Sequence, residues 1–229
     1  PSDSNAFSFS GAPFGDFDLA PGQTKSVTVL AGDYQVKQAA EPGYDLTGVS
    51  CDDGALSPSQ GDPAGASASI KVSAGETVRC TFTSVKRAHL TVAQKSRPAG
   101  AGPFSFTGAL GSFALAGGQT RSFEVAPGSY HVSQAARRGF AVTGVSCPDS
   151  DSSASAATRS AVARLAPGEQ LTCTFSARDD AAPAVKLGKL DRRKKTLGGT
   201  ASDPAGIASM RVALSRKAGK RCRWWSGRR

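Results

Sequence analysis

Residues 22–51 read GQTKSVTVLAGDYQVKQAAEPGYDLTGVSC, and residues 118–147 read GQTRSFEVAPGSYHVSQAARRGFAVTGVSC. The two stretches align without a gap at an offset of 96 residues, and they share the GQT start, the Y-x-V-x-Q centre and the TGVSC end. The likeness continues to a C-T-F sequence at Cys80 and again at Cys173. A unit of roughly 80 to 90 residues has therefore been duplicated, and each copy carries two cysteines.

Apolar and polar residues alternate in short runs throughout the second copy, for example in Phe104-x-Phe106 and Leu171-x-Cys173-x-Phe175. Alternation with a period of two predicts half-buried β-strands. Turns such as APGQ and APGE separate the runs, because Pro presets φ and Gly supplies the positive φ of a type II turn. About seven short strands per copy predict an all-β fold, either a sandwich or a partly open barrel.

The cysteines are placed alike in the two copies, as Cys51 with Cys80 and as Cys147 with Cys173. No pair has C-x-x-C spacing and neither His is a near neighbour of a Cys, which disfavours a zinc site. We expect one disulfide within each copy, and therefore an oxidising compartment and a secreted or surface-displayed protein. Cys222 has no counterpart, and we expect it to be free or paired outside this segment.

The formal net charge of +10 is concentrated at the C-terminal end. Residues 1–84 carry a net charge of −6, residues 85–176 carry +5 and residues 177–229 carry +11. A basic stripe over both copies is therefore absent, and the sequence predicts no specific nucleic-acid partner. No apolar run reaches the length of about 18 residues that a transmembrane helix needs, so no membrane span is predicted.

The domain organisation follows from the repeat. The expected units are a sandwich at residues 1–84, a second sandwich at residues 85–177 and a partial third unit at residues 184–229. The first copy lacks a counterpart of AHLTVAQK at residues 88–95, so we expect its first strand upstream of Pro1. We interpret the chain as a monomeric segment of a larger protein. The short stretch Ser84–His89 predicts two domains placed end to end with limited freedom.

The second copy resembles SpaA and Cna B-type domains through a combination of short motifs: F-S-F-T-G, G-Q-T, A-P-G-S-Y-x-V-x-Q, T-G-V-S-C and L-T-C-T-F. These domains have a prealbumin-like fold and form the stalk repeats of bacterial surface proteins and pilins, and the resemblance covers residues 6–177 in two copies. It implies tandem β-sandwiches that act as a stalk or adhesion module on the cell surface. It implies neither catalysis nor a cofactor or metal.

Many members of that family cross-link themselves through a Lys–Asn isopeptide bond that a Glu promotes. On this resemblance Lys95 matches the Lys, whereas Gln134 and Gln38 stand at the acid and Ser176 and Ser84 at the Asn. The chain contains a single Asn, near its N-terminus. The resemblance therefore implies that no isopeptide bond forms here and that the disulfides replace it.

The C-terminal stretch GTASDPAGIASMRVALSRKAGKRCRWW resembles the opening of a bacterial immunoglobulin-like repeat. Candidate polyanion contacts are Arg192, Arg193, Lys194, Lys195, Trp224 and Trp225. Cations beside stacking faces can bind single-stranded nucleic acid or an anionic polymer, and the alternative is a basic hairpin with two strand aromatics. The partners expected for the whole segment are a cell-wall polymer or a host surface protein.

Two further alternatives remain at this point. Two aspartates follow the first cysteine of each copy: Asp52 and Asp53 in the first, Asp149 and Asp151 in the second. They are either calcium ligands or solvated turn residues. No G-x-S-x-G elbow and no pair of carboxylates stands out, so the sequence predicts no enzyme. The alternative to a structural function is a carbohydrate- or protein-binding module that uses the loops at the sandwich ends. Those loops contain no aromatic residue after the first cysteine, which favours the structural function.

Overall fold

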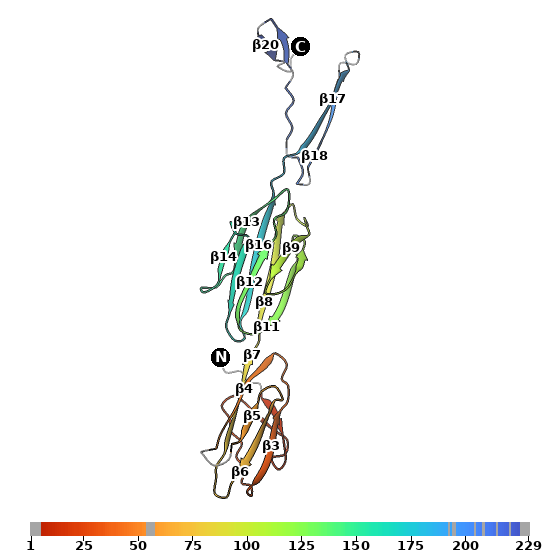
Figure 1. Cartoon of the computed structure of the whole chain (residues 1–229). Coiled ribbons are helices and arrows are strands. Elements are labelled where there is room, and N and C mark those ends of the chain that lie inside the picture. Colours follow the sequence, from red (N-terminus) through yellow and green to blue (C-terminus); the bar gives the residue numbers. More distant parts are fainter. Residues whose placement is uncertain are drawn as a thin grey trace.

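The computed structural model of the chain describes residues 6–53, 58–191, 193, 196–203, 205–207, 209–213, 215–219 and 221–224. Those residues form strands, turns and irregular segments without a helix, so the fold is all-β, and none of them belongs to a helix that could cross a membrane. Two β-sandwiches follow one another along an elongated molecule (Figure 1). We call them repeat 1, residues 6–86, and repeat 2, residues 88–179.

Repeat 2 is a sandwich of two sheets. The first contains, in spatial order, β10 (Phe113–Leu115), β9 (Phe104–Gly108), β12 (Gly128–Gln134), β15 (Ser160–Leu165) and β14 (Ser153–Ser155). The second contains β11 (Thr120–Val125), β8 (Ala88–Arg97), β16 (Gln170–Asp179) and β13 (Phe140–Ser146). Every neighbouring pair is antiparallel except β8 and β16, which are parallel over their whole shared length.

Repeat 1 has the same first sheet but a smaller second one. The first sheet runs β2 (Phe17–Leu19), β1 (Phe7–Ser10), β3 (Gly32–Gln38), β6 (Ser67–Val72) and β5 (Gln60–Asp62). Within the described residues 6–53 and 58–86 the second sheet contains β4 (Tyr44–Asp52) and β7 (Arg79–Lys86). Among its described residues repeat 1 has no counterpart of β8. Residues 24–29, which match β11 in sequence, form no strand, because β11 pairs only with β8 in repeat 2.

The two cores share an aromatic trio. In repeat 2 the ring of Phe106 stacks on Phe113 with centroids 5.1 Å apart and meets the ring of Phe175 edge-on at 5.1 Å. In repeat 1 Phe9 makes the matching contacts with two phenylalanines, at 5.3 and 5.2 Å. Around this trio repeat 2 buries a large cluster from both sheets, whereas the buried cluster of repeat 1 consists of Phe7, Phe9 and Val36.

Each disulfide joins two neighbouring antiparallel strands. Cys51 on β4 lies opposite Cys80 on β7, with Cα atoms 4.0 Å apart, and the two sulfurs are bonded. Cys147, directly after β13, is bonded to Cys173 on β16, with Cα atoms 4.3 Å apart. These are the pairs expected from the sequence. Closing a loop of this size stabilises the fold by about 3.6 kcal/mol in the chain-entropy account.

The C-terminal region forms two separate hairpins. They are β17 (Ala184–Asp191) with β18 (Thr196–Ser202), and β19 (Ser215–Ala218) with β20 (Arg221–Trp224). Apolar side chains remain uncovered here: Val185 is 57% exposed, Leu187 67% and Met210 62%. The immunoglobulin-like repeat at residues 184–229 stays a prediction, and the side chain of Cys222 lies outside the described ones.

We predict that the two repeats unfold in separate thermal transitions, and that repeat 1 unfolds first because its core is smaller. Phe106 is fully buried, so Phe106→Ala should destabilise the upper transition by about 3–5 kcal/mol. Phe9→Ala should move only the lower one. Differential scanning calorimetry checks this, and a response of the lower transition to Phe106→Ala would contradict it.

We also predict that limited proteolysis removes the C-terminal hairpins first, because their apolar side chains are exposed and their backbone is held by two-stranded ladders. Trypsin should cut near Arg178 or at residues 192–195 and leave residues 6–177 intact. Mass spectrometry of the fragments identifies the sites. A first cut inside repeat 2 would contradict the expected order of stability.

Candidate functional site

The first and last strands of repeat 2 lie side by side in the middle of its second sheet (Figure 1). The parallel ladder between β8 and β16 extends from His89 beside Gln170 to Arg97 beside Arg178. Because the strands are parallel, the start of β8 and the end of β16 lie at opposite ends of the sandwich. The chain therefore enters repeat 2 at one end and leaves it at the other.

A pair of buried amides joins the two sheets of repeat 2. Gln134 on β12 donates through Nε2 to Oε1 of Gln94 on β8 at 3.0 Å, and Gln94 donates through Nε2 to the Lys95 carbonyl at 2.8 Å. Gln94 is 1% exposed and Gln134 3%. Buried amides are costly unless they are hydrogen-bonded, so this pair fixes the register of β8 against the opposite sheet.

The assignment of Lys95 to the cross-linking position of the family is wrong. The inward residues of β8 are Ala88, Leu90, Val92 and Gln94, whereas the side chain of Lys95 is exposed. Side chains on a strand alternate between the two faces, so the residue after Gln94 has to point outward. The sandwich interior at this place holds an amide pair and offers no lysine.

The two serines assigned to the Asn position are not equivalent to each other. Ser176 lies beside Lys95 in the parallel ladder. Ser84 pairs with Leu46, at the place where Ala177 pairs with Val142 in repeat 2. The mismatch arises because the three-residue deletion shifts the offset between the last strands of the two copies.

In repeat 1 the buried amide has a different partner. Gln38, the counterpart of Gln134, is 7% exposed and donates through Nε2 to the Ser84 hydroxyl at 3.0 Å. Its Oε1 atom is buried and has no hydrogen-bond partner among the described residues. Ser84 thus accepts the amide N–H of Gln38, whereas in repeat 2 the N–H of Gln134 is donated to Gln94 on β8. The amide oxygen of Gln38 stays without a partner among the described residues.

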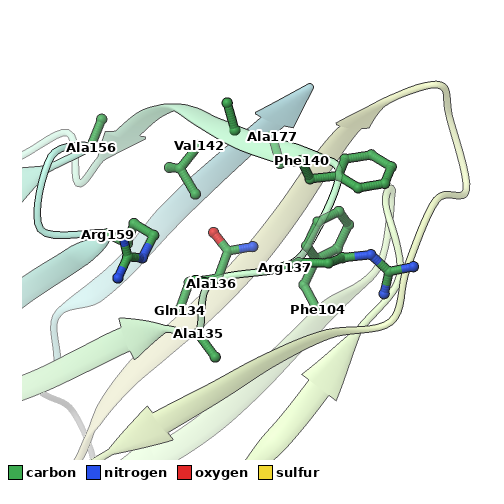
Figure 2. A pocket seen from close by; sticks show the side chains of 11 residues that line it. Phe104, Gln134, Ala135, Ala136, Arg137, Phe140, Val142, Ala156, Arg159 and Ala177 are labelled. Atoms are coloured by element: carbon green, nitrogen blue, oxygen red, sulfur yellow. The ribbon is translucent and has the colours of Figure 1, made fainter. Parts of the chain in front are cut away.

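A pocket of about 240 Å³ opens at the end of repeat 2 where Gln134 lies. In Figure 2 Arg159 lies on one side of the Gln134 side chain, and on the other side Arg137 extends away from Gln134 beside Phe104 and Phe140. Arg137 stacks over the rings of Phe104 and Phe140, with Cζ 5.2 and 5.3 Å from their centroids. It also donates through Nη1 to the carbonyl of Pro103.

Three polar atoms of this pocket are buried without a hydrogen-bond partner among the described residues: Nε of Arg137, Nε of Arg159 and Oε1 of Gln134. The two Nε–H groups are donors that suit a small anionic group such as a carboxylate, whereas Gln134 Oε1 can only accept a hydrogen bond. Repeat 1 has Glu41 and Ala66 at the matching positions, so the cationic pocket belongs to repeat 2 alone.

A single residue, Arg87, separates β7 from β8. Its backbone N–H donates to the Gly43 carbonyl at 2.8 Å, and the N–H of Gly168 donates to the Lys86 carbonyl at 3.3 Å. Two residues after Arg87, the backbone N–H of His89 donates to the backbone carbonyl of Glu169 at 2.8 Å. The backbone that joins the repeats is thus held from both sides, which restricts rotation between them.

Side chains reinforce this junction. Arg87 donates through Nε and Nη2 to Oδ1 of Asp45, at 2.9 and 2.6 Å. The hydrogen bond to Asp45, and then its charge, raise the pKa of Arg87 above its ordinary value. Gly168, with φ +73°, packs so closely that an added Cβ would lie 3.0 Å from Lys86 Cδ. The Lys86 side chain is flexible and can move away, so the cost of a side chain at Gly168 comes from the positive φ, which residues with a Cβ rarely adopt.

The structure does not bring the candidate polyanion contacts together in a described site. Arg192, Lys194, Lys195 and Trp225 lie outside the described residues, and of Trp224 only the backbone, in β20, is described. Arg193 is exposed, in the turn between β17 and β18, and its N–H donates to Asp191 Oδ1 at 2.9 Å. The polyanion contact stays a prediction.

The aspartates after the first cysteines hold local turns. Asp149 accepts a hydrogen bond from the Ser152 hydroxyl at 2.5 Å, and Asp53 accepts one from the backbone N–H of Ser59. In the part of the chain that the structure describes, no group of three or more His, Cys, Asp or Glu side chains could hold a metal ion. The described contacts are those of turn residues.

Sequence reasoning missed Gln94, Arg137 and Arg159. The alternation of Ala88, Leu90 and Val92 already points to residue 94 as the next inward position, and this signal was available. The pocket arginines carried no such signal, because they are far apart in sequence and meet only at the end of the folded sandwich.

Comparisons with solved structures show the following likenesses. A major pilin from Streptococcus pyogenes is 13% identical, with 72% of this chain and 75% of that chain covered and a TM-score of 0.23. A second S. pyogenes major pilin is 10% identical, with coverages of 76% and 88% and a TM-score of 0.22. The Bacillus anthracis TIE protein is 11% identical, with coverages of 96% and 44% and a TM-score of 0.28. All three TM-scores lie below 0.5.

No match to the chain was found among the curated proteins. Two family models, both described as a prealbumin-like fold domain of the SpaA type, match residues 3–86 and residues 88–175. Together they cover both sandwiches described above. The chain belongs to the family of SpaA-type prealbumin-like fold proteins, of which it carries two domains in tandem.

Proposed function

We propose that this chain is a non-catalytic stalk module of a secreted or surface-displayed bacterial protein, and that it transmits tension along its length. The parallel pairing of β8 with β16 carries this proposal. The two disulfides fit an extracellular location, because such bonds persist in oxidising compartments. Adhesion to a cell-wall polymer or a host surface protein belongs to the same proposal.

Tension between the two ends of repeat 2 acts on β8 and β16 in opposite directions along the strand axis. The ladder is then loaded in shear, so that its hydrogen bonds share the force and have to break together. A hydrogen-bonded pair pulled from the same end would instead open one bond at a time. The amide pair of Gln94 and Gln134 adds a buried contact that sliding of β8 has to break.

The disulfides limit how far an unfolded repeat can extend. The bond between Cys147 and Cys173 shortcuts 26 residues, and the bond between Cys51 and Cys80 shortcuts 29. Force that travels along the backbone passes through the sulfur bridge, so the closed loops stay out of the path. Under tension the module therefore lengthens less than its chain length allows.

The junction at Arg87 extends the same path from one repeat to the next. We predict that inserting Gly-Ser-Gly between Arg87 and Ala88 makes the molecule flexible, because it separates the backbone hydrogen bonds on either side. Small-angle X-ray scattering should show a rigid, elongated wild type and a broad distribution of maximum dimensions for the variant. Both thermal transitions should stay in place.

The matched control carries the same insertion between Gly111 and Ser112, an exposed turn of repeat 2. It should scatter like the wild type. A wild type that already scatters as two freely jointed bodies would overturn the rigid-stalk proposal.

The cationic pocket favours a second function, a binding module that uses one sandwich end. Arg137 and Arg159 each have a buried Nε–H group without a partner among the described residues, which can donate to an anionic group such as the side chain of an acidic residue. The pocket volume of about 240 Å³ suits one such group rather than a large ligand.

We predict that N-acetylglutamate shifts the Nε–H resonances of Arg137 and Arg159 in an NMR titration. Arg159→Ala should weaken the affinity about ten-fold, because it removes one charged hydrogen-bond donor. Arg138→Ala, which removes an exposed neighbouring charge, is the control and should bind like the wild type. Equal losses in the two variants would indicate general charge attraction and reject the pocket.

A further inference from the structure

A groove with a volume of about 580 Å³ lies at the end of repeat 2 where β8 and β16 end. β8 lines it with Lys95 and Arg97, β16 with Ser176 and Arg178, and β13 with Thr143. Side chains on a strand alternate between its two faces, so both cations of β8 lie on the outer face of the sheet, opposite to the buried residues of the same strand. The groove is thus a surface feature that lies apart from the interior amide pair.

The three cations of this groove lack a counter-charge among the described residues. Lys95, Arg97 and Arg178 are exposed, and the described part of the chain gives none of them an ion pair. The acid next to Arg178 along the chain, Asp179, instead accepts the N–H of Ala181 at 2.9 Å. In the parallel ladder Arg97 lies directly beside Arg178. Like charges on neighbouring strands destabilise a sheet, so this pair is unfavourable until an anion lies between the two guanidinium groups.

Small residues leave the groove open to a chain that lies along it. Gly117 packs directly against Ser96, where an added Cβ would clash with Oγ, whereas a Cβ on Gly118 would meet open space. Thr143 lies at the bulge of β13, and its hydroxyl donates to the Ser176 carbonyl at 3.3 Å. Among the described residues that line the groove there is neither an acidic nor an aromatic side chain. An occupant therefore meets cations and hydroxyl groups.

The arrangement of the charges indicates a phosphate polymer. Two adjacent guanidinium groups suit the oxygens of one phosphodiester, because the planar fork of arginine matches phosphate geometry. Lys95 lies two residues before Arg97, about 7 Å away between Cα atoms along the strand. Two successive phosphates that are joined through a three-carbon polyol can span that distance. Nucleobases would lack a stacking surface on the described lining residues, so a polyol polymer fits better than a nucleic acid.

We propose that this groove binds a polyol polymer linked by phosphodiesters, with one phosphate between Arg97 and Arg178 and the next beside Lys95. The inference rests on the proposed function, since it gives a chemical class to the cell-wall polymer named there. Repeat 1 has the uncharged Val85 on β7 at the place of Arg178. The binding site therefore belongs to repeat 2.

The test is an NMR titration of the full chain with a synthetic glycerol phosphate hexamer. The amide resonances of Gly117, Gly118 and Ser176 should shift, whereas binding to the basic C-terminal region is read separately from the resonances of that region. Arg97→Ala and Arg178→Ala should each weaken the affinity at the groove about five-fold, because each removes one charged hydrogen-bond donor.

The matched control is Arg164→Ala, which removes an exposed arginine from β15 in the opposite sheet and should bind the hexamer like the wild type. Calorimetry of the free protein excludes unfolding as the cause of weaker binding. At low salt Arg178→Ala should raise the midpoint of the repeat 2 transition by about 1–2 °C, because it relieves the like-charge pair. A lowered midpoint would overturn the arrangement of charges on which the groove depends.

Two comparison ligands carry a similar number of negative charges, 5′-phosphorylated hexathymidylate and hexagalacturonate. Both should bind at the groove resonances more weakly than the hexamer, by about five-fold or more. Equal or tighter binding of hexathymidylate would assign the groove to nucleic acid. Equal binding of hexagalacturonate, or equal losses in Arg164→Ala and Arg178→Ala, would indicate general charge attraction. Each of these results overturns the proposal.

Two other outcomes separate this inference from the function on which it rests. Shifts confined to the basic C-terminal region would overturn the groove and leave adhesion to a polymer in place. A hexamer that binds nowhere on the chain would overturn both the groove and adhesion to such a polymer. The tension path does not depend on either result, because force and scattering measurements test it.

Discussion

The backbone ladder between β8 and β16 is the interaction on which the rest of repeat 2 depends. It joins the first strand to the last, so that residues far apart in sequence close one sheet in its middle. The buried faces of these strands supply Leu90, Val92 and Phe175 to the core. Repeat 1 lacks this ladder among its described residues, and its buried cluster is correspondingly small. The contrast between the two repeats indicates that β8 contributes much of the buried core of repeat 2.

Much of the fold could be predicted because its signals are local. Alternation, Gly-containing turns and the duplicated spacing indicated the strands and the cysteine pairs, since each depends on residues close in sequence or repeated in register. The amide pair could be predicted only in part: Gln134 and Gln38 stood out through the repeat, whereas their partner was misplaced by one residue. On a strand one residue changes the face, and Lys95 is exposed where Gln94 is buried.

The site at the sandwich end could not be predicted, because it depends on side chains that only the fold brings together. Arg137 follows β12 and Arg159 precedes β15, and in repeat 1 the same backbone positions hold Glu41 and Ala66. The two copies therefore share a frame but differ in chemistry at one end. Duplication kept the interior pattern, including both buried glutamines, and left the ends and the outward faces free to diverge.

Pulling a single molecule from its two ends tests the central claim most directly. In repeat 1 the first described strand, β1, lies in the opposite sheet from β7, so tension separates the sheets rather than shearing one ladder. Repeat 2 should therefore unfold at a clearly higher force than repeat 1. Reduction of its disulfide should lengthen the released chain by about 90 Å, at up to about 3.6 Å per residue, because the bonded cysteines are 26 positions apart in the sequence. Unfolding of repeat 2 at a force equal to or below that of repeat 1 would contradict the account.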